Sequence, residues 1–213
     1  MPTQKYYNLV DHKKDGILRA MGEELLEHSY QEITVSRIIG RAGISRASFY
    51  GYFKDKEDML GCIFQRLKED MTEQFLRFIR EEEGNAFRGG RRFLEYLLED
   101  ESGWSVCRIY HSLHNDPESR ERMFRLEREW HREGMFARFV HRCYESLDPA
   151  GYPEIGEELL SSMLELGTLV IAKTVMFMFL TEADIDKGKI KKTAVMQLAI
   201  LERGMRERKE VEE

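Results

Sequence analysis

The sequence predicts an all-α protein, and three observations support this fold class. Of its 213 residues, 42% are hydrophobic and 34% are charged, and only 4 are prolines. No stretch alternates apolar and polar residues as a half-buried strand does. Residues 34–53 have the pattern of two short helices joined by a tight turn. We therefore expect a three-helix helix-turn-helix domain at residues 1–55 and a larger all-helical domain at residues 56–213.

The chain begins with ten polar and aromatic residues that include Lys5. Such an arm is expected to be frayed, or alternatively to touch DNA beside a main contact. The first long helix is expected at about residues 11–28, where apolar side chains recur at the three- and four-residue spacing of an amphipathic helix.

Residues 34–53 carry capping signals for two further helices. Thr34 and Ser45 can each cap one, because a hydroxyl oxygen accepts a backbone N–H that the helix leaves without a partner. Gly43 between them is expected to have a positive φ, which glycine adopts at little cost. The expected core of the three helices consists of Leu18, Met21, Leu25, Val35, Ile38, Ile39, Ile44, Phe49 and Phe53.

The rest of the chain is expected to be helical as well. A long helix is predicted at about 55–83 with Asp55 as its cap, and glycines at 84, 89 and 90 then interrupt the pattern. Later helices are expected at about 93–98, 106–114, 117–147, 154–181 and 186–208. The helix at 154–181 is apolar almost all round from Met163 onward, which is typical of a buried helix.

The net charge is −6, so the protein as a whole is not a basic nucleic-acid binder. Between residues 34 and 56, however, five cationic side chains accompany a single acidic one, Asp55. The five are Arg37, Arg41, Arg46, Lys54 and Lys56. A basic patch on an acidic body fits one face turned to phosphate, because the remainder keeps the protein soluble.

Three cysteines without a CxxC pair favour reduced thiols, and we expect a cytoplasmic protein without a signal peptide. The apolar run 166–180 contains Lys173 and is too short to span a bilayer comfortably. No nucleophile elbow, P-loop, HExxH or dinucleotide fingerprint is present, so neither an enzyme nor a cofactor is expected. His111 and His114 lie one turn apart but lack a further nearby ligand, so no metal site is expected.

Residues 15–60 resemble the TetR family of transcriptional regulators. The matching residues are Ile17-Leu18, Ala20, Ser29-Tyr30, Ile33-Thr34-Val35, Ile38, Ala42-Gly43-Ile44-Ser45, Ser48-Phe49-Tyr50, Tyr52-Phe53, Lys56-Glu57 and Leu60. Two positions depart from the family pattern. Gly40 stands where the family usually has alanine, and Gly51 stands where many relatives carry a larger side chain able to reach bases. One possible base contact is therefore missing at residue 51.

In a helix-turn-helix the second helix enters the major groove with its N-terminal residues at base edges. Arg46 is a candidate for bidentate contact with guanine, and a phosphate contact is the equally weighted alternative. For Tyr52 the alternative is partial burial, and for Arg37 it is exposure to solvent. With the family's phosphate-contacting positions, the candidate DNA-binding residues are Thr34, Arg37, Ser45, Arg46, Ala47, Ser48, Tyr50, Tyr52 and Lys56.

The resemblance implies a homodimeric repressor that a small apolar or aromatic ligand releases from a palindromic operator on double-stranded DNA. As in the family, the helices at 154–181 and 186–208 of two subunits would form a four-helix interface; an intramolecular core is the alternative. Candidate ligand-binding residues are Trp104, Tyr110, Trp130, Phe136, Met163, Thr174 and Phe177, each of which is alternatively a core residue. The alternative function is a dimeric DNA-binding regulator without a small-molecule effector, controlled by a protein partner.

Overall fold

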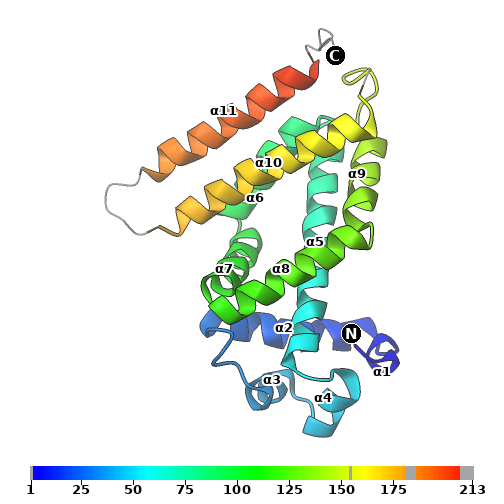
Figure 1. Ribbon diagram of the computed structural model, residues 1–213, viewed down its shortest axis with the longest axis vertical. Coiled ribbons are helices and arrows are strands. Elements are labelled where there is room, and N and C mark those ends of the chain that lie inside the picture. Colours follow the sequence, from blue (N-terminus) through cyan, green and yellow to red (C-terminus); the bar gives the residue numbers. More distant parts are fainter. Residues whose placement is uncertain (1, 154, 181–185, 207–213) are drawn as a thin grey trace. The chain divides into compact units, whose positions relative to one another are not determined.

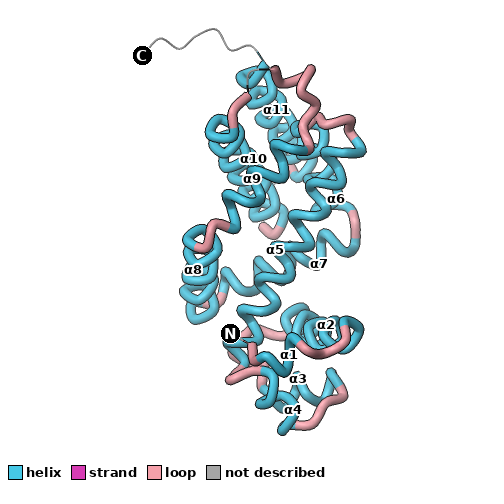
Figure 2. Tube along the Cα trace, turned by 90° about the vertical axis from the view of Figure 1, so that its right-hand side faces the viewer, coloured by secondary structure: helices cyan, strands magenta, loops and turns pink. Residues whose placement is uncertain are grey.

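The computed structural model describes residues 2–153, 155–180 and 186–206 (Figure 1). Every regular element in these ranges is a helix (Figure 2), which confirms the predicted all-α fold class. The chain divides into two compact units, Met1–Asp70 with Ser105–Glu129 and Met71–Trp104 with Trp130–Glu213. The long helix α5, Lys56–Glu81, contributes residues to both units. The division into a DNA-binding and an effector-binding domain between residues 55 and 56 therefore stays a prediction.

The first unit begins with helices α1 (Gln4–Tyr7), α2 (Asp11–Glu27), α3 (Val35–Ala42) and α4 (Arg46–Tyr52). The predicted capping signals are confirmed. The Thr34 hydroxyl accepts a hydrogen bond from the Arg37 amide at 3.3 Å, and the Ser45 hydroxyl accepts one from the Ser48 amide at 3.0 Å. Gly43 has φ 63°, so the turn between α3 and α4 uses the conformation that favours glycine.

Five of the nine predicted core side chains of this unit are fully buried: Met21, Leu25, Ile38, Phe49 and Phe53. The other four, Leu18, Val35, Ile39 and Ile44, are half-buried. Tyr6, Tyr30 and Ile33 are also buried, although the predicted core did not include them.

The expectation of a frayed N-terminal arm is wrong. Residues 4–7 form α1, whose Tyr6 side chain is only 4% exposed and whose ring centre lies 4.9 Å from that of Phe53. The Thr3 amide donates to the carbonyl oxygen of Tyr52 at 2.9 Å, and the Thr3 hydroxyl donates to that of Gly51 at 2.7 Å. The arm is therefore fixed to the end of α4 by both apolar packing and hydrogen bonds.

The remaining helices are α6 (Ala86–Glu99), α7 (Glu101–Asn115), α8 (Pro117–Arg132), α9 (Met135–Glu145), α10 (Glu157–Met178) and α11 (Lys187–Arg206). Two predictions are corrected here. Gly89 and Gly90 lie inside α6 rather than interrupting a helix. Gly89 allows α6 to pack closely against α5, because a Cβ atom there would meet the backbone nitrogen of Ile79 at 2.9 Å. The single helix expected at 117–147 is broken at Gly134, which has φ 70°.

The core of the second unit joins α5, α6, α9 and α10. It contains Phe75, Leu76, Ile79, Ala86, Val140, Cys143, Leu147, Tyr152, Leu160 and Leu164. A smaller cluster of Leu94, Ala194 and Leu198 joins α6 to α11. Helices α10 and α11 run side by side in opposite directions (Figure 1).

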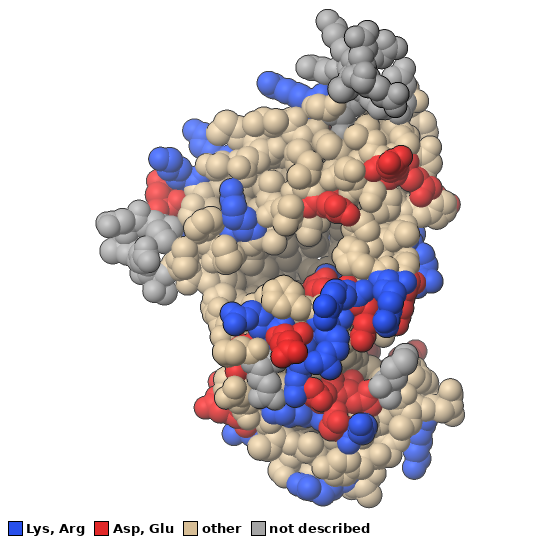
Figure 3. Space-filling view, in the orientation of Figure 1, with Lys and Arg blue, Asp and Glu red and all other residues tan. Residues whose placement is uncertain are grey.

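Much of helix α10 is exposed within one chain, so the alternative of an intramolecular core does not account for all of its apolar side chains. Leu166, Leu169 and Met176 are 47%, 66% and 56% exposed, and on α11 Met196 and Ile200 are 53% and 62% exposed. The surface over these helices accordingly carries few charged side chains (Figure 3). Within the described ranges, α10 is the one helix long and apolar enough to cross a membrane, which for a single helix is weak evidence for a membrane span.

Candidate DNA-binding site

Helix α4 has one buried face and one exposed face. Phe49 and Phe53 are fully buried, so the interpretation of these aromatic side chains as core rather than base-stacking residues agrees with their positions. Ser45, Arg46 and Ala47 at the beginning of the helix are exposed. This half of α4 therefore presents small and cationic side chains, which a groove can admit closely.

Arg46 is oriented by a neighbouring helix. One of its terminal nitrogens, Nη2, donates to the hydroxyl oxygen of Ser36 on α3 at 2.7 Å. Ser36 was not among the predicted site residues, and a contact across ten residues and a turn leaves no signal in the sequence. The Tyr50 side chain beside Phe49 is 49% exposed, while the half-buried Ser48 hydroxyl lies 2.9 Å from that of Ser45.

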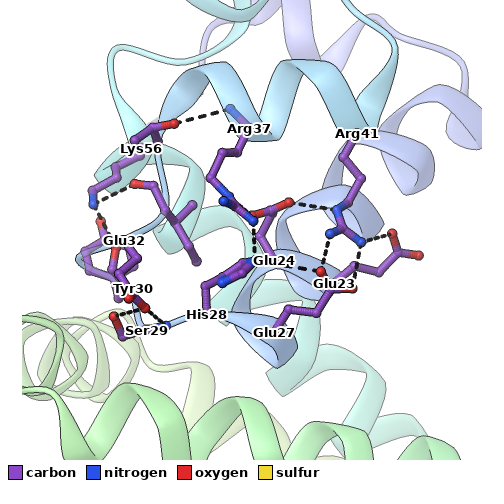
Figure 4. Close-up of polar contacts among 12 residues, drawn as sticks. Glu23, Glu24, Glu27, His28, Ser29, Tyr30, Glu32, Arg37, Arg41 and Lys56 are labelled. Atoms are coloured by element: carbon purple, nitrogen blue, oxygen red, sulfur yellow. Dashed lines mark hydrogen bonds and ion pairs between the residues drawn. The ribbon is translucent and has the colours of Figure 1, made fainter.

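Two cations of the predicted basic patch are paired with acidic residues of α2 (Figure 4). Arg37 Nε donates to Glu24 at 2.7 Å, and Arg41 Nε donates to the other oxygen of the same carboxylate at 2.8 Å. Glu24 is only 3% exposed. Burial by itself raises the pKa of Glu24, but the hydrogen bonds from both guanidinium groups outweigh it and hold the pKa below its ordinary value.

The same network extends along α2. Arg41 also pairs with Glu23 and Glu27, and Arg37 Nη2 contacts the ring nitrogen Nε2 of His28. These contacts fix α3 to α2 and neutralise part of the patch. They favour a structural role for the Arg37 guanidinium, whose contact with DNA stays a prediction.

Lys56, predicted to contact phosphate, is held by the segment between α2 and α3 (Figure 4). Its ammonium group donates to the carbonyl oxygens of Tyr30 and Ile33 at 2.8 and 3.0 Å and lies 4.3 Å from the centre of the Tyr30 ring. Lys56 thus stabilises the entry to the helix-turn-helix. Tyr52 is half-buried with its ring 6.5 Å from that of Tyr6, which agrees with the partial-burial alternative.

The predicted ligand-binding residues do not fall into one unit. Tyr110 belongs to the first unit, where burial, and secondly the Glu127 carboxylate, raises the pKa of its hydroxyl. The other six belong to the second, where the Trp104 ring stacks on Phe179 at 4.6 Å. The rings of Trp130 and Phe136 lie 5.8 Å apart. The binding role of all seven residues stays a prediction.

The remaining predicted ligand-binding residues, Met163, Thr174 and Phe177, lie on α10. Thr174 is buried and donates its hydroxyl to the carbonyl oxygen of Val170 at 2.7 Å. Met163 and Phe177 are half-buried. In the described part of the chain, no group of three or more histidine, cysteine or acidic residues could hold a metal ion.

A groove of about 350 Å³ lies between α10 and α11. It is lined by Leu166, Leu169, Val170, Lys173, Gln197, Ile200 and Leu201. The side-chain oxygen of Gln197 is buried there without a hydrogen-bond partner among the described residues. Exposed apolar patches of this kind occur at protein–protein and ligand-binding surfaces.

Known proteins share both the sequence of the first unit and the fold of the chain. Residues 17–61 match the family of bacterial regulatory proteins named tetR. A fatty acid metabolism regulator from Bacillus subtilis strain 168 is 35% identical over 66 residues, which are 27% of this chain and 34% of that protein. The match therefore spans about a third of the length of this curated relative.

Two solved structures share the fold over nearly the whole chain. A TetR-family transcriptional regulator from Mesorhizobium loti, 16% identical, has a TM-score of 0.63 and is matched over 93% of this chain and 96% of that chain. A fatty acid degradation regulator from Bacillus halodurans, 19% identical, has a TM-score of 0.55 over 97% and 98% of the two chains. Residues 17–61 are thus a helix-turn-helix of the tetR family, and the chain as a whole has the fold of TetR-family transcriptional regulators.

Proposed function

We propose that the protein is a homodimeric repressor that binds a palindromic operator and is released from it by a small molecule. The observation that carries the DNA-binding part is the division of α4, whose aromatic side chains are buried while Ser45, Arg46 and Ala47 are exposed. This is the arrangement that a recognition helix needs in the major groove. Such a regulator works in the cytoplasm, where the chromosome is.

The dimer is supported by the exposed apolar face of α10 and α11. One helix-turn-helix buries too little surface for a specific genomic site, so two half-sites about one helical turn apart are required. Leu169 and Ile200, 66% and 62% exposed, offer apolar area that a second copy would remove from water. The groove between the two helices adds a surface into which side chains of the partner can pack.

The effector is proposed to be a small apolar ligand. It acts by population shift, because it must bind the conformation that does not fit the operator better than the one that does. The curated relative is named for fatty acid metabolism, so fatty acids of graded chain length form the first set to test. A ligand that binds the folded protein raises the melting temperature, and it must also lower operator affinity. A dimer that responds to no small molecule would favour the alternative, control by a protein partner.

The decisive test of DNA binding is to select fragments of source genomic DNA that the purified protein retains. We expect an inverted repeat with half-sites about 10 base pairs apart, or a multiple of this spacing. Failure to bind any duplex better than bulk DNA would overturn the proposal. The neighbouring genes would at the same time identify what the protein regulates.

Arg46→Ala then tests the proposed base contact of the recognition helix α4. If Arg46 contacts guanine, the variant loses about 1–3 kcal/mol of operator binding and relaxes its preference at one base position. Equal losses on operator and random DNA would instead assign Arg46 to a phosphate. Ser36→Ala is the matched variant, because it removes the 2.7 Å hydrogen bond to Arg46 and leaves the guanidinium in place.

A further inference from the structure

The recognition helix lacks a side chain at residue 51. By resemblance to the family, this position on α4 carries a side chain able to reach bases in many relatives, and here it is a glycine. A Cβ atom on Gly51 would have ordinary contact distances, the nearest being 3.7 Å, so packing within the first unit does not require a glycine. What lies over Gly51 is instead a segment from the other end of the domain.

That segment is α1 with the residue before it. Thr3 donates two hydrogen bonds to the carbonyl oxygens of Gly51 and Tyr52, which lie at the end of α4 where a helix leaves its carbonyls without partners. Tyr6 on the same short helix is buried against Phe53. The two contacts fix both the position and the rotation of α1 on the recognition helix.

Lys5 lies between these two anchors, and its side chain covers Gly51. The distance from a Cβ atom on Gly51 to Cδ of Lys5 is 3.7 Å, and the distance to Nζ is also 3.7 Å. Lys5 is exposed, so its ammonium group remains accessible to solvent at the place where a longer residue 51 would project. A lysine reaches phosphate as a compact point charge on a flexible stem.

The charges around α4 make this cation more important. Of the five cations in the predicted patch, Arg37 and Arg41 are paired with glutamates of α2, and Lys56 is bound to backbone carbonyls. The side chains of Arg46 and Lys54 remain without an acidic or carbonyl partner among the residues that the structure describes; Lys54 bonds Asp58 only through its backbone amide. One additional lysine beside α4 is therefore a large part of the charge that this surface can offer to DNA.

We propose that Lys5 contacts a phosphate of the operator beside Gly51, where α4 itself has no side chain to reach DNA. The inference rests on the proposed function, since it presupposes an operator. It makes α1 part of the DNA-binding surface rather than only a cover for the core. Lys5 would contribute affinity and fix the register of α4, but it would not read sequence.

The test measures operator and random-DNA affinity between 50 and 200 mM salt for the full chain and for Lys5→Ala. Each phosphate contact adds about 0.9 to the slope of log affinity against log salt, so a dimer that loses two contacts has a slope shallower by about 1.8. Across this fourfold salt range, Lys5→Ala should therefore lose about 12-fold less affinity than the unmodified protein. The losses should be equal on operator and random DNA, and the melting temperature should be unchanged.

Two further variants separate this role from a general charge effect. Arg80→Ala removes one positive charge from an exposed position in the second unit and should leave the slope unchanged. Lys5→Ala combined with Gly51→Lys returns a lysine to the same place from α4 itself, and it should restore the slope.

Three outcomes would overturn the inference while leaving the proposed function intact. The first is an unmodified protein that binds its operator with a slope that Lys5→Ala does not change. The second is a loss confined to the operator, which would assign Lys5 to a base. The third is a change in the salt slope for Arg80→Ala as large as that for Lys5→Ala. If the unmodified protein binds no operator at all, the proposed function fails first.

Discussion

The helix-turn-helix and the α10–α11 pair both carry many apolar side chains but leave different surfaces to solvent. In the helix-turn-helix, Met21, Ile38 and Phe49 are fully buried, and the exposed residues of α3 and α4 other than Tyr50 are small, polar or charged. On α10 and α11, Leu169 and Ile200 are more than half exposed. The first surface is complete in one chain, whereas the second exposes apolar area that a soluble monomer rarely keeps.

The two surfaces also differ in how far their charged and polar groups are paired. Around α3, the Glu24 carboxylate binds Arg37 and Arg41, so opposite charges are matched within the unit. The groove between α10 and α11 contains one cation, Lys173, and the unsatisfied oxygen of Gln197 among mainly aliphatic residues. The charges on the first surface are thus paired within the unit, while the second surface is the one on which the proposed dimer depends.

Leu169→Glu should have the largest effect. A charge at the centre of the proposed interface removes an apolar contact from each protomer, at roughly 1.5–3 kcal/mol per side chain, or about 3–6 kcal/mol per dimer. The dimer dissociation constant should therefore rise at least about 100-fold, and operator binding should be lost with it. Sedimentation equilibrium measures the first effect and a gel-shift titration the second.

Phe124→Glu is the control for that variant. Phe124 on α8 is 56% exposed, similar to Met176 on α10, but it lies outside the α10–α11 face. It should leave the dimer unchanged. A Leu169→Glu protein that remains dimeric would show that the apolar face is covered by something else, and the comparison between the two regions would lose its explanation.

Gly89→Ala and Gly90→Ala probe the closed core of the second unit with two adjacent residues. A methyl group at 89 would lie 2.9 Å from the Ile79 backbone, so α6 and α5 must move apart, and we expect a loss of about 1–3 kcal/mol in the free energy of unfolding. At 90 the nearest atom is a ring carbon of Phe75 at 3.8 Å. There the better helix propensity of alanine should stabilise the protein by up to about 1 kcal/mol. Denaturant unfolding measures the free energy of unfolding of both variants. Equal changes at the two positions would contradict the packing argument.

The predictions from sequence succeeded where the cause is local. Thr34, Gly43 and Ser45 act through backbone groups within about four residues, and each behaves as its pattern predicted. The cap of Asp55 agrees for the same reason, since its carboxylate accepts the amide of Asp58 three residues ahead. Local signals of this kind are legible in one sequence because they do not depend on which helix packs nearby.

The predictions failed where the cause lies elsewhere in the chain. Gly89 marks a close approach between helices, and its sequence context resembles a helix break. For α10 the sequence left two alternatives open, because apolar residues on all sides look the same whether the cover is the same chain or another copy. The matched charges at α3 were missed because Glu24 lies 13 and 17 residues from its two arginines. Docking of α1 likewise depends on a contact between Thr3 and residues about 50 positions away.

Glu24→Gln should cost less than Gly89→Ala, and it tests whether the Glu24 carboxylate holds α2 and α3 together. The amide keeps the shape and one acceptor but loses the charge, so we expect a loss of about 1–2 kcal/mol in the free energy of unfolding at pH 7. The folded state holds the pKa of Glu24 below its ordinary 4.5, so this contribution is present above pH 4.5 and is lost as the pH falls through the lowered pKa. The difference in the free energy of unfolding between the unmodified protein and Glu24→Gln should therefore narrow on acidification below pH 4.5.

Glu23→Gln is the control, because its side chain is 44% exposed and lies 3.4 Å from Arg41, and it should cost at most about 1 kcal/mol. A difference in unfolding free energy between the unmodified protein and Glu24→Gln that stays constant down to pH 2 would mean that the carboxylate charge does not join α2 to α3. The comparison between the helix-turn-helix and the α10–α11 pair would then depend on their apolar residues alone.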